Sequence, residues 1–302
     1  MEDEQFTTLS QRWGTISSAL PPFRVVLRNC FANTAPPHLL IYTPPYGDFL
    51  NQEPASVLAL TAQDCKLLIA DLDEPDNSEQ VDVSSMSYSQ ILWIELADLE
   101  LQGQLVLVFT VGKKVCRVGI CFDRRMRNLY FEAAIWFLLG MTERHQRPGA
   151  DHPEDHLSLV SPLPLEFATA LQYNVPPGEQ LQAAVSWPAA CSKPWLSLFT
   201  HELASAGALG ITNRTLIFLR KEQGRDWDLN LQESPVVPIR SLYLPRERLD
   251  RWSKKTTDMT AVFTLTTKSH ALEQPWEFAV PLSHTQAVES VLGIWSAMSS
   301  SS

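Results

Sequence analysis

A tight hairpin is the feature of this sequence that most constrains its fold. Residues 209–219 read Leu-Gly-Ile-Thr-Asn-Arg-Thr-Leu-Ile-Phe-Leu, which is two apolar arms around a Thr-Asn turn at 212–213. Asn tolerates the left-handed backbone conformation that such turns need, and β-branched and aromatic residues in the second arm favour a strand. Residues 57–70 form a weaker copy with a polar turn. The pattern predicts antiparallel β-structure in both halves of the chain.

Short apolar runs bounded by Gly, Pro and polar residues predict further strands. We expect them at 23–27, 38–42, 91–96, 105–110, 115–122, 179–187, 236–244, 259–267 and 276–280. Each half is expected to close with an amphipathic helix, because apolar residues recur there every three or four positions. Asp123 is the expected N-cap of the first helix, and 283–286 reads Ser-His-Thr-Gln, a capping box for the second. The second helix carries its apolar stripe at Val288, Val291, Leu292, Trp295 and Met298.

The two halves share this order of elements, which indicates an internal duplication. Thr61 and Thr212, one in each hairpin, differ by 151 positions (212 − 61), whereas Trp136 and Trp295, one in each closing helix, differ by 159 (295 − 136). The second half should therefore hold about eight extra residues between hairpin and helix. We place them at 249–255.

Residues 211–218, Ile-Thr-Asn-Arg-Thr-Leu-Ile-Phe, resemble the Thr-Asn-x-Arg-Leu hairpin of bacterial pleckstrin-homology-like (PH-like) and GRAM-like domains. The match departs at Thr215, where many members carry a second Arg. The resemblance covers 178–298, and it covers 38–140 mainly by element order. It implies a mainly β fold with α, in which a bent β-barrel or roll is capped by a C-terminal helix and Trp136 and Trp295 lie in the core. It implies no activity, because this superfold hosts lipid, peptide and protein recognition alike.

The domain organisation that follows from this resemblance is two PH-like domains in tandem. Their expected boundaries are 1–37 for an N-terminal segment, 38–144 for the first domain, 145–175 for a linker, 176–298 for the second domain and 299–302 for a disordered tail.

Composition limits the classes of partner. The chain has 302 residues and a net charge of −10, so as a whole it repels phosphate backbones and we expect no nucleic-acid partner. Its five cysteines include no C-x-x-C pair, and no apolar run approaches the roughly 20 residues of a membrane span. With an acidic N-terminus in place of a basic signal sequence, the chain is expected in the cytoplasm.

Two polar segments have the composition, but not the pattern, of metal sites. Residues 71–82 hold six carboxylates, yet Pro75 occupies a ligand position of a calcium loop and Asp76 stands where Gly is required. Residues 151–156 hold two His and three acids, which the polarity of a linker explains without a metal. We expect no metal and no cofactor.

Catalytic motifs are incomplete. His201-Glu202 begins like the zinc motif H-E-x-x-H, but Ser205 replaces the second His. The sequence has no G-x-S-x-G elbow and no phosphate-binding glycine loop. We therefore expect a protein that is not an enzyme.

Two segments are candidates for binding. Between 220 and 255, nine Lys and Arg residues outnumber six acids, which is typical either of a solvated face or of an anion-binding patch. The apolar segment 194–199 is either an additional core element or an exposed patch for a protein partner. The candidate binding residues are Arg246, Arg248, Arg251, Trp252, Lys254, Lys255, Trp195, Leu198 and Phe199.

These observations favour an adaptor or scaffold that binds another protein, or a second copy of itself, through strand edges or through the groove between final helix and sheet. The alternative is a peripheral membrane adaptor that binds anionic lipid through a basic patch at 240–255. Salt separates the two, since lipid binding through charge weakens as ionic strength rises.

Overall fold

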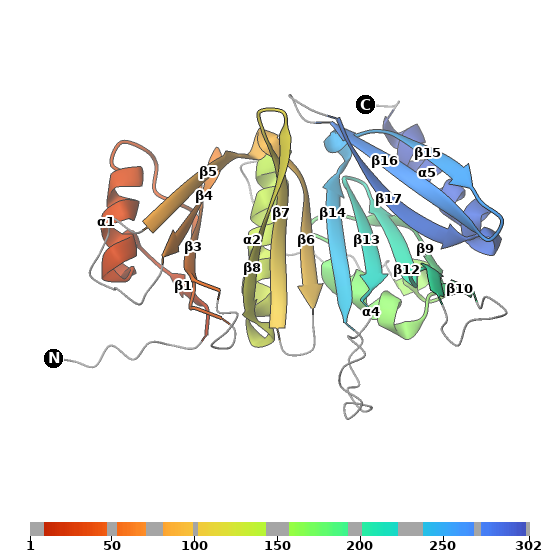
Figure 1. Ribbon diagram of the computed structural model, residues 1–302, viewed down its shortest axis with the longest axis horizontal. Coiled ribbons are helices and arrows are strands. Elements are labelled where there is room, and N and C mark those ends of the chain that lie inside the picture. The colour runs from red at the N-terminus through yellow and green to blue at the C-terminus, as the bar shows by residue number, and fades with distance from the viewer. Residues whose placement is uncertain are drawn as a thin grey trace.

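The computed structural model describes most of the chain, and every structural statement below concerns that part. The described ranges are 9–46, 53–70, 81–98, 102–142, 157–192, 201–222, 238–268 and 273–299. The fold is mainly β, with open antiparallel sheets and a C-terminal helix (Figure 1).

The N-terminal half begins with β1 (Gln11–Trp13) and a 3-10 turn and then forms what we call the first unit, from helix α1 (Pro21–Cys30) to helix α2 (Arg127–Met141). Between the helices lie β2 (Leu39–Thr43), β3 (Ala55–Leu60), β4 (Asp64–Ala70), β5 (Val81–Ser87), β6 (Ile91–Asp98), β7 (Gln102–Val111) and β8 (Lys114–Asp123). Strands β1 to β5 form one sheet, in that order.

The C-terminal half forms the second unit, from helix α4 (Leu165–Asn174) to helix α5 (Thr285–Ser299), and a short helix α3 (Leu157–Val160) precedes it. Its strands are β9 (Leu181–Trp187), β10 (Ala190–Ser192), β11 (His201–Ala204), β12 (Gly207–Thr212), β13 (Thr215–Lys221), β14 (Ile239–Pro245), β15 (Leu249–Thr256), β16 (Thr260–Lys268) and β17 (Glu273–Pro281). Strands β15 to β17 form a separate three-stranded sheet, and β10 pairs with β11.

The elements of the first unit recur in the second at offsets that change in two steps. Helix α4 begins 144 residues after α1 (165 − 21), and β13 begins 151 after β4 (215 − 64). From β5 and β14 onward the offset is constant at 158, both for these strands (239 − 81) and for α2 and α5 (285 − 127). The first unit's helix, strands and closing helix therefore all have counterparts in the second.

These offsets correct two details of the predicted repeat. The extra residues do not lie at 249–255, which form strand β15, the counterpart of β6; the offset changes between β13 and β14. Trp295 corresponds at an offset of 158 to Phe137 and not to Trp136. Accordingly Phe137 and Trp295 are both buried in the cores of their units, whereas Trp136 is half-buried and stacks on His38.

A seven-stranded sheet joins the two units. Its order is β8-β7-β6-β14-β13-β12-β9, so the central pair, β6 and β14, comes from different units. The two strands are antiparallel over five residue pairs, from Ile239 opposite Asp98 to Tyr243 opposite Ile94. Figure 1 shows this sheet running across the middle of the molecule, with the first unit on one side and the second on the other.

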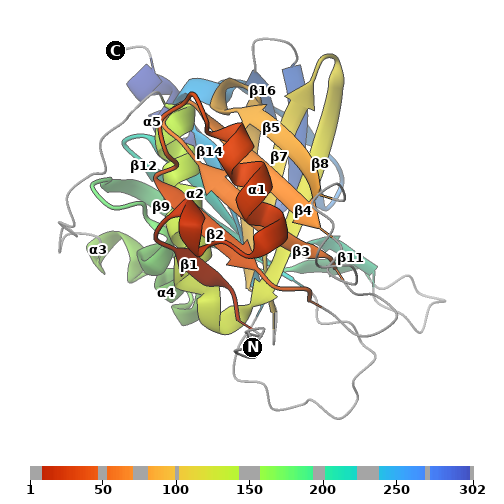
Figure 2. The same ribbon diagram turned by 90° about the vertical axis from the view of Figure 1, so that its left-hand side faces the viewer.

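Three apolar clusters fill the structure. The largest lies between β2 to β8 and α2 and continues to the face of β12 to β14 that α4 covers, through Phe167, Leu171 and Tyr243. A second lies inside the second unit, where α5 contributes Val288, Val291, Leu292 and Trp295, as its sequence pattern predicts. The third packs α1 onto the outer face of the first sheet, which Figure 2 shows facing the viewer.

The strand predicted at 23–27 is wrong, because this segment belongs to helix α1. Pro21 and Pro22 occupy the first helical positions, where the fixed φ of proline suits a helix and no N–H is needed. Phe23 and Leu27 lie one turn apart and are fully buried, while Val25 between them is 49% exposed. The burial therefore follows the period of a helix.

Of the two caps predicted for the closing helices, the one at Asp123 is present and the one at 283–286 is not. The Asp123 carboxylate accepts a hydrogen bond from the backbone N–H of Arg125, as expected of a cap, although it caps a 3-10 turn that leads into α2. The capping box at 283–286 is wrong: Ser283 lies inside a 3-10 turn, and α5 begins only at Thr285.

Several segments are more regular than the sequence indicates. Strands β5 and β15 were not predicted, and both are largely exposed edge strands of their sheets. Residues 157–174, within the predicted linker, contain α3 and α4, whose Val160, Phe167 and Leu171 are buried in the largest cluster.

Candidate functional site

The candidate binding residues from the sequence lie at two places on the second unit. Arg246 and Arg248 belong to the 3-10 turn between β14 and β15, whereas the others of the described set lie on β15 itself. Trp195, Leu198 and Phe199 lie outside the described residues, as do the acidic segment 71–80 and the possible metal ligands at 151–156.

Arg248 contacts the first unit. Its guanidinium donates to the carbonyl oxygen of Tyr88 at 3.0 Å and lies 3.5 Å from that of Met141, the last residue of α2. A cation at this end of a helix interacts favourably with the helix dipole. Arg248 therefore connects the turn between β14 and β15 to the first unit. Its guanidinium is engaged in these contacts and is not available as part of an exposed basic surface.

The cations of β15 are mostly paired with carboxylates. Arg251 contacts Asp250 at 2.9 Å and Glu273 at 2.8 Å, and the ammonium of Lys254 contacts Glu289 of helix α5. Lys255 is exposed. The charge of this strand is thus largely balanced by its neighbours.

Trp252 holds β15 against helix α5. Its indole N–H donates to the hydroxyl of Ser296 at 3.1 Å, and its ring packs 6.1 Å from that of Phe263. Both contacts are within the second unit, so the ring joins β15 to α5 and to the second apolar cluster.

The seam between β6 and β14 carries a buried ionic network that the sequence analysis missed. Glu95, only 7% exposed, accepts hydrogen bonds from Arg117 at 2.7 Å, from Arg240 at 2.9 Å and from the indole N–H of Trp93 at 3.1 Å. Arg240 also donates to Glu222 at 2.6 Å. A single Glu inside the apolar run 91–97 was the available signal, because a buried carboxylate needs a partner.

The charges of this network stabilise one another. Burial alone would raise the pKa of the Glu222 carboxyl, but hydrogen bonds and charge from Arg240 and Arg220 hold that pKa below its ordinary value. Burial acts against the charge of Arg240 as well, yet Glu222 and Glu95 raise its pKa. The pKa shifts of Glu222 and Arg240 both favour the charged forms, and the network links β6 to β14 across the seam.

A second polar cluster lies on the other face of the seam. Arg127, the first residue of α2, donates to Asp98 of β6 at 2.6 Å and to Asn174 of α4 at 2.8 Å. The hydroxyl of Tyr243 on β14 donates to the same oxygen of Asn174. The phenol ring of Tyr243 also lies beside Phe131 of α2, with ring centroids 6.4 Å apart. The junction therefore combines strand pairing, polar contacts and an apolar contact.

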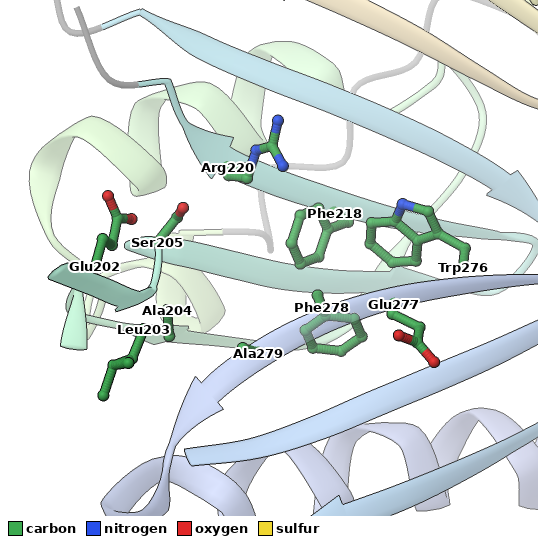
Figure 3. Close-up of a pocket in the computed structure, with 10 residues that line it drawn as sticks. All are labelled: Glu202, Leu203, Ala204, Ser205, Phe218, Arg220, Trp276, Glu277, Phe278 and Ala279. Atoms are coloured by element: carbon green, nitrogen blue, oxygen red, sulfur yellow. The ribbon is translucent and has the colours of Figure 1, made fainter. Parts of the chain in front are cut away.

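A pocket of about 430 Å³ lies in the second unit, where β17 passes β11 and β13. Figure 3 shows Phe218, Trp276 and Phe278 together on one side of it, with Arg220 next to Phe218 and with Glu202 on the opposite side, beside Ser205. The rings of Phe218 and Trp276 meet edge to face at 4.6 Å. Such a wall can receive an apolar side chain or a cation.

The incomplete zinc motif does not form a helix. His201–Ala204 is strand β11, so residues 201 and 205 do not lie one helical turn apart. Within the described ranges, no three His, Cys, Asp or Glu side chains are grouped as metal ligands would be. Of the helices described, none has the length and apolar character needed to cross a bilayer.

The open strand edges are a further candidate for a binding site. Strand β15 is the counterpart of β6, yet β6 is covered by β14 whereas β15, among the strands of the described ranges, pairs on one side only, with β16. In the same way β5 is the counterpart of β14, and within the part of the chain that the structure describes it pairs with β4 alone. No protein-family model matches the chain, and no curated protein matches it either.

Proposed function

We propose that this chain is a non-catalytic interaction protein of two PH-like units, and that it binds an extended segment of a partner protein along the open edge of β15. One observation carries the proposal: the corresponding edge of the first unit, that of β6, holds an antiparallel strand. Backbone N–H and C=O groups along an unpaired strand edge are the usual basis of strand addition, in which main-chain hydrogen bonds supply much of the affinity.

The side chains of β15 indicate the chemistry of the segment. Arg251 and Lys254 are paired with carboxylates of the second unit, whereas Lys255 is exposed without a carboxylate partner among the ion pairs of the described residues. A segment with an acidic residue opposite Lys255 would add a cross-strand ion pair. Because Trp252 and α5 lie on one side of the strand, apolar residues of the segment would pack on that side.

A selection from a random-peptide library tests this proposal. Peptides selected on the wild-type protein should be rich in acidic residues and should lose binding to Lys254→Glu/Lys255→Glu. The matched control, Lys113→Glu/Lys114→Glu, makes the same charge change at the turn into β8 and should leave binding unchanged. A selected peptide should also slow amide hydrogen exchange across 249–256. Peptides that bind both variants equally, or that protect another segment, would contradict the proposal.

A further inference from the structure

The junction within the chain provides a template for a junction between chains. It pairs β6 of the first unit with β14 of the second. The counterpart of β6 is β15, in the second unit, and the counterpart of β14 is β5, in the first, both at an offset of 158 (249 − 91 and 239 − 81). Both counterparts are edge strands of their sheets. One chain thus presents both halves of a second junction, on different units.

We infer that β15 of one copy pairs antiparallel with β5 of another copy, in the register of the β6–β14 seam. This inference rests on the proposed function, because it names the strand that fills the β15 edge. The seam aligns Arg240 with Ala97 and Ser241 with Leu96. The β5 counterparts of the β14 residues are found by subtracting 158, and the β15 counterparts of the β6 residues by adding 158. This places Asp82 (240 − 158) opposite Lys255 (97 + 158), and Val83 (241 − 158) opposite Lys254 (96 + 158).

Charge complementarity supports this register. Asp82 and Lys255 are both exposed, and opposite charges directly across an antiparallel pair are stabilising. Val83, which is 42% exposed, would lie against the aliphatic part of Lys254. A register shifted by one residue would break the pairing of Asp82 with Lys255. Side chains alternate along a strand, so Lys254 points to the opposite face from Lys255.

The contact between copies should be weaker than the seam within the chain. The seam also packs Phe131 against Tyr243, and the counterparts of these residues are Glu289 and Ser85. Backbone hydrogen bonds and the ion pair therefore remain, without the aromatic contact. Since the two edges differ, the contact is heterologous, and each added copy leaves one open edge of each kind. The assembly grows beyond a dimer as the concentration rises.

Sedimentation velocity over a hundredfold range of concentration, up to about 1 mM, tests the inference. The weight-average mass should rise past twice the 34.0 kDa of one chain. Asp82→Lys and Lys255→Asp each place like charges opposite one another and should weaken association about tenfold, and the double variant should recover it to within about threefold. A mass of 34.0 kDa at every concentration, a plateau at the dimer, or failure of the double variant to recover would overturn the inference.

Disulfide trapping tests the register directly. On a Cys191→Ser background, which removes an exposed thiol, Val83→Cys/Lys254→Cys should give a ladder of oligomers under mild oxidation. Paired positions of antiparallel strands lie within the distance that a disulfide spans. Val83→Cys/Lys255→Cys is the control, because residue 255 points to the other face. Equal ladders from both would overturn the register.

The two proposals fail separately. If selected peptides bind β15 while the protein stays monomeric and untrapped, the self-association is wrong and the binding edge stands. If the protein assembles through the Asp82–Lys255 pair while no peptide is selected, the partner is a second copy alone. Unchanged thermal unfolding of each variant ensures that a loss of assembly does not reflect a loss of fold.

Discussion

Glu95 and Arg240 lie 145 residues apart in the sequence and meet at 2.9 Å across the seam between the units. Removing Arg240 would leave two carboxylates, Glu95 and Glu222, without their shared cation. We expect Arg240→Ala to lower the free energy of unfolding by about 3 kcal/mol, the low end for breaking a buried pair, because Arg117 still contacts Glu95. Denaturant unfolding measures this change. Arg220→Ala, which removes a more exposed cation, should cost less than about 1 kcal/mol; equal losses would contradict the assigned role.

The lowered pKa of Glu222 makes part of the stability depend on pH. A carboxyl whose folded pKa lies below its unfolded value of about 4.3 stabilises the fold fully above that value. The contribution is lost as the pH falls through the lower folded pKa. We therefore expect the stability difference between wild type and Glu222→Gln to be constant from pH 7 to about pH 5 and to narrow below about pH 4. Glu277→Gln is a control at an exposed carboxylate. A difference that widens on acidification would refute the assignment.

Local sequence patterns correctly predicted those elements in which the residues of one face are buried along the whole element. The hairpin at 209–219, the strands at 105–110 and 115–122 and the apolar stripe of α5 were found because their side chains alternate or recur with the period of the element. The hairpin turns also share a detail: the hydroxyls of Thr61 and Thr212 both accept backbone hydrogen bonds from the residue three positions on.

The sequence patterns did not predict elements that are exposed at sheet edges or whose buried face packs against a distant part of the chain. Strands β5 and β15 lie at sheet edges and are exposed along most of their length, so their sequences lack the apolar alternation of a half-buried strand. Helix α1 was mistaken for a strand because its buried face meets a sheet that only the tertiary fold supplies. The seam joins residues about 145 positions apart, and no local pattern encodes that pairing.

Gly140 of α2 and Gly293 of α5 should respond oppositely to the same substitution. A Cβ on Gly140 would lie 2.4 Å from the ring of Tyr88, which is buried and held by a 2.7 Å hydrogen bond to the carbonyl of Thr61. Gly140→Ala should therefore destabilise the protein by about 2 kcal/mol. Gly293 has nothing within 4 Å of its Cβ position, so Gly293→Ala should stabilise by about 0.5–1 kcal/mol. Thermal or denaturant unfolding of both variants measures these changes in stability. If Gly140→Ala stabilised the protein, the ring of Tyr88 would be able to move away from the new methyl group, and the prediction would be wrong.

Anionic lipid is the alternative ligand for the basic stretch 240–255, and the ion pairs of the second unit argue against it. Arg251 and Lys254 contact Asp250, Glu273 and Glu289, so little uncompensated charge faces solvent there. We expect the protein to pellet with vesicles of anionic lipid no more than with neutral vesicles, even at low salt, where such attraction is strongest.

The variants for this vesicle assay should avoid Arg248, whose contacts with Tyr88 and Met141 make its loss a structural change. Lys254→Glu/Lys255→Glu removes the charge of the exposed strand, and Lys113→Glu/Lys114→Glu is the matched control on the first unit. A different result would be salt-sensitive binding of the wild type to anionic vesicles that only the first variant loses. The exposed face of β15 would then be a membrane-binding surface, and its ligand would be lipid instead of a protein segment. Equal pelleting of all three proteins with both vesicle types would exclude anionic lipid as the ligand of this edge.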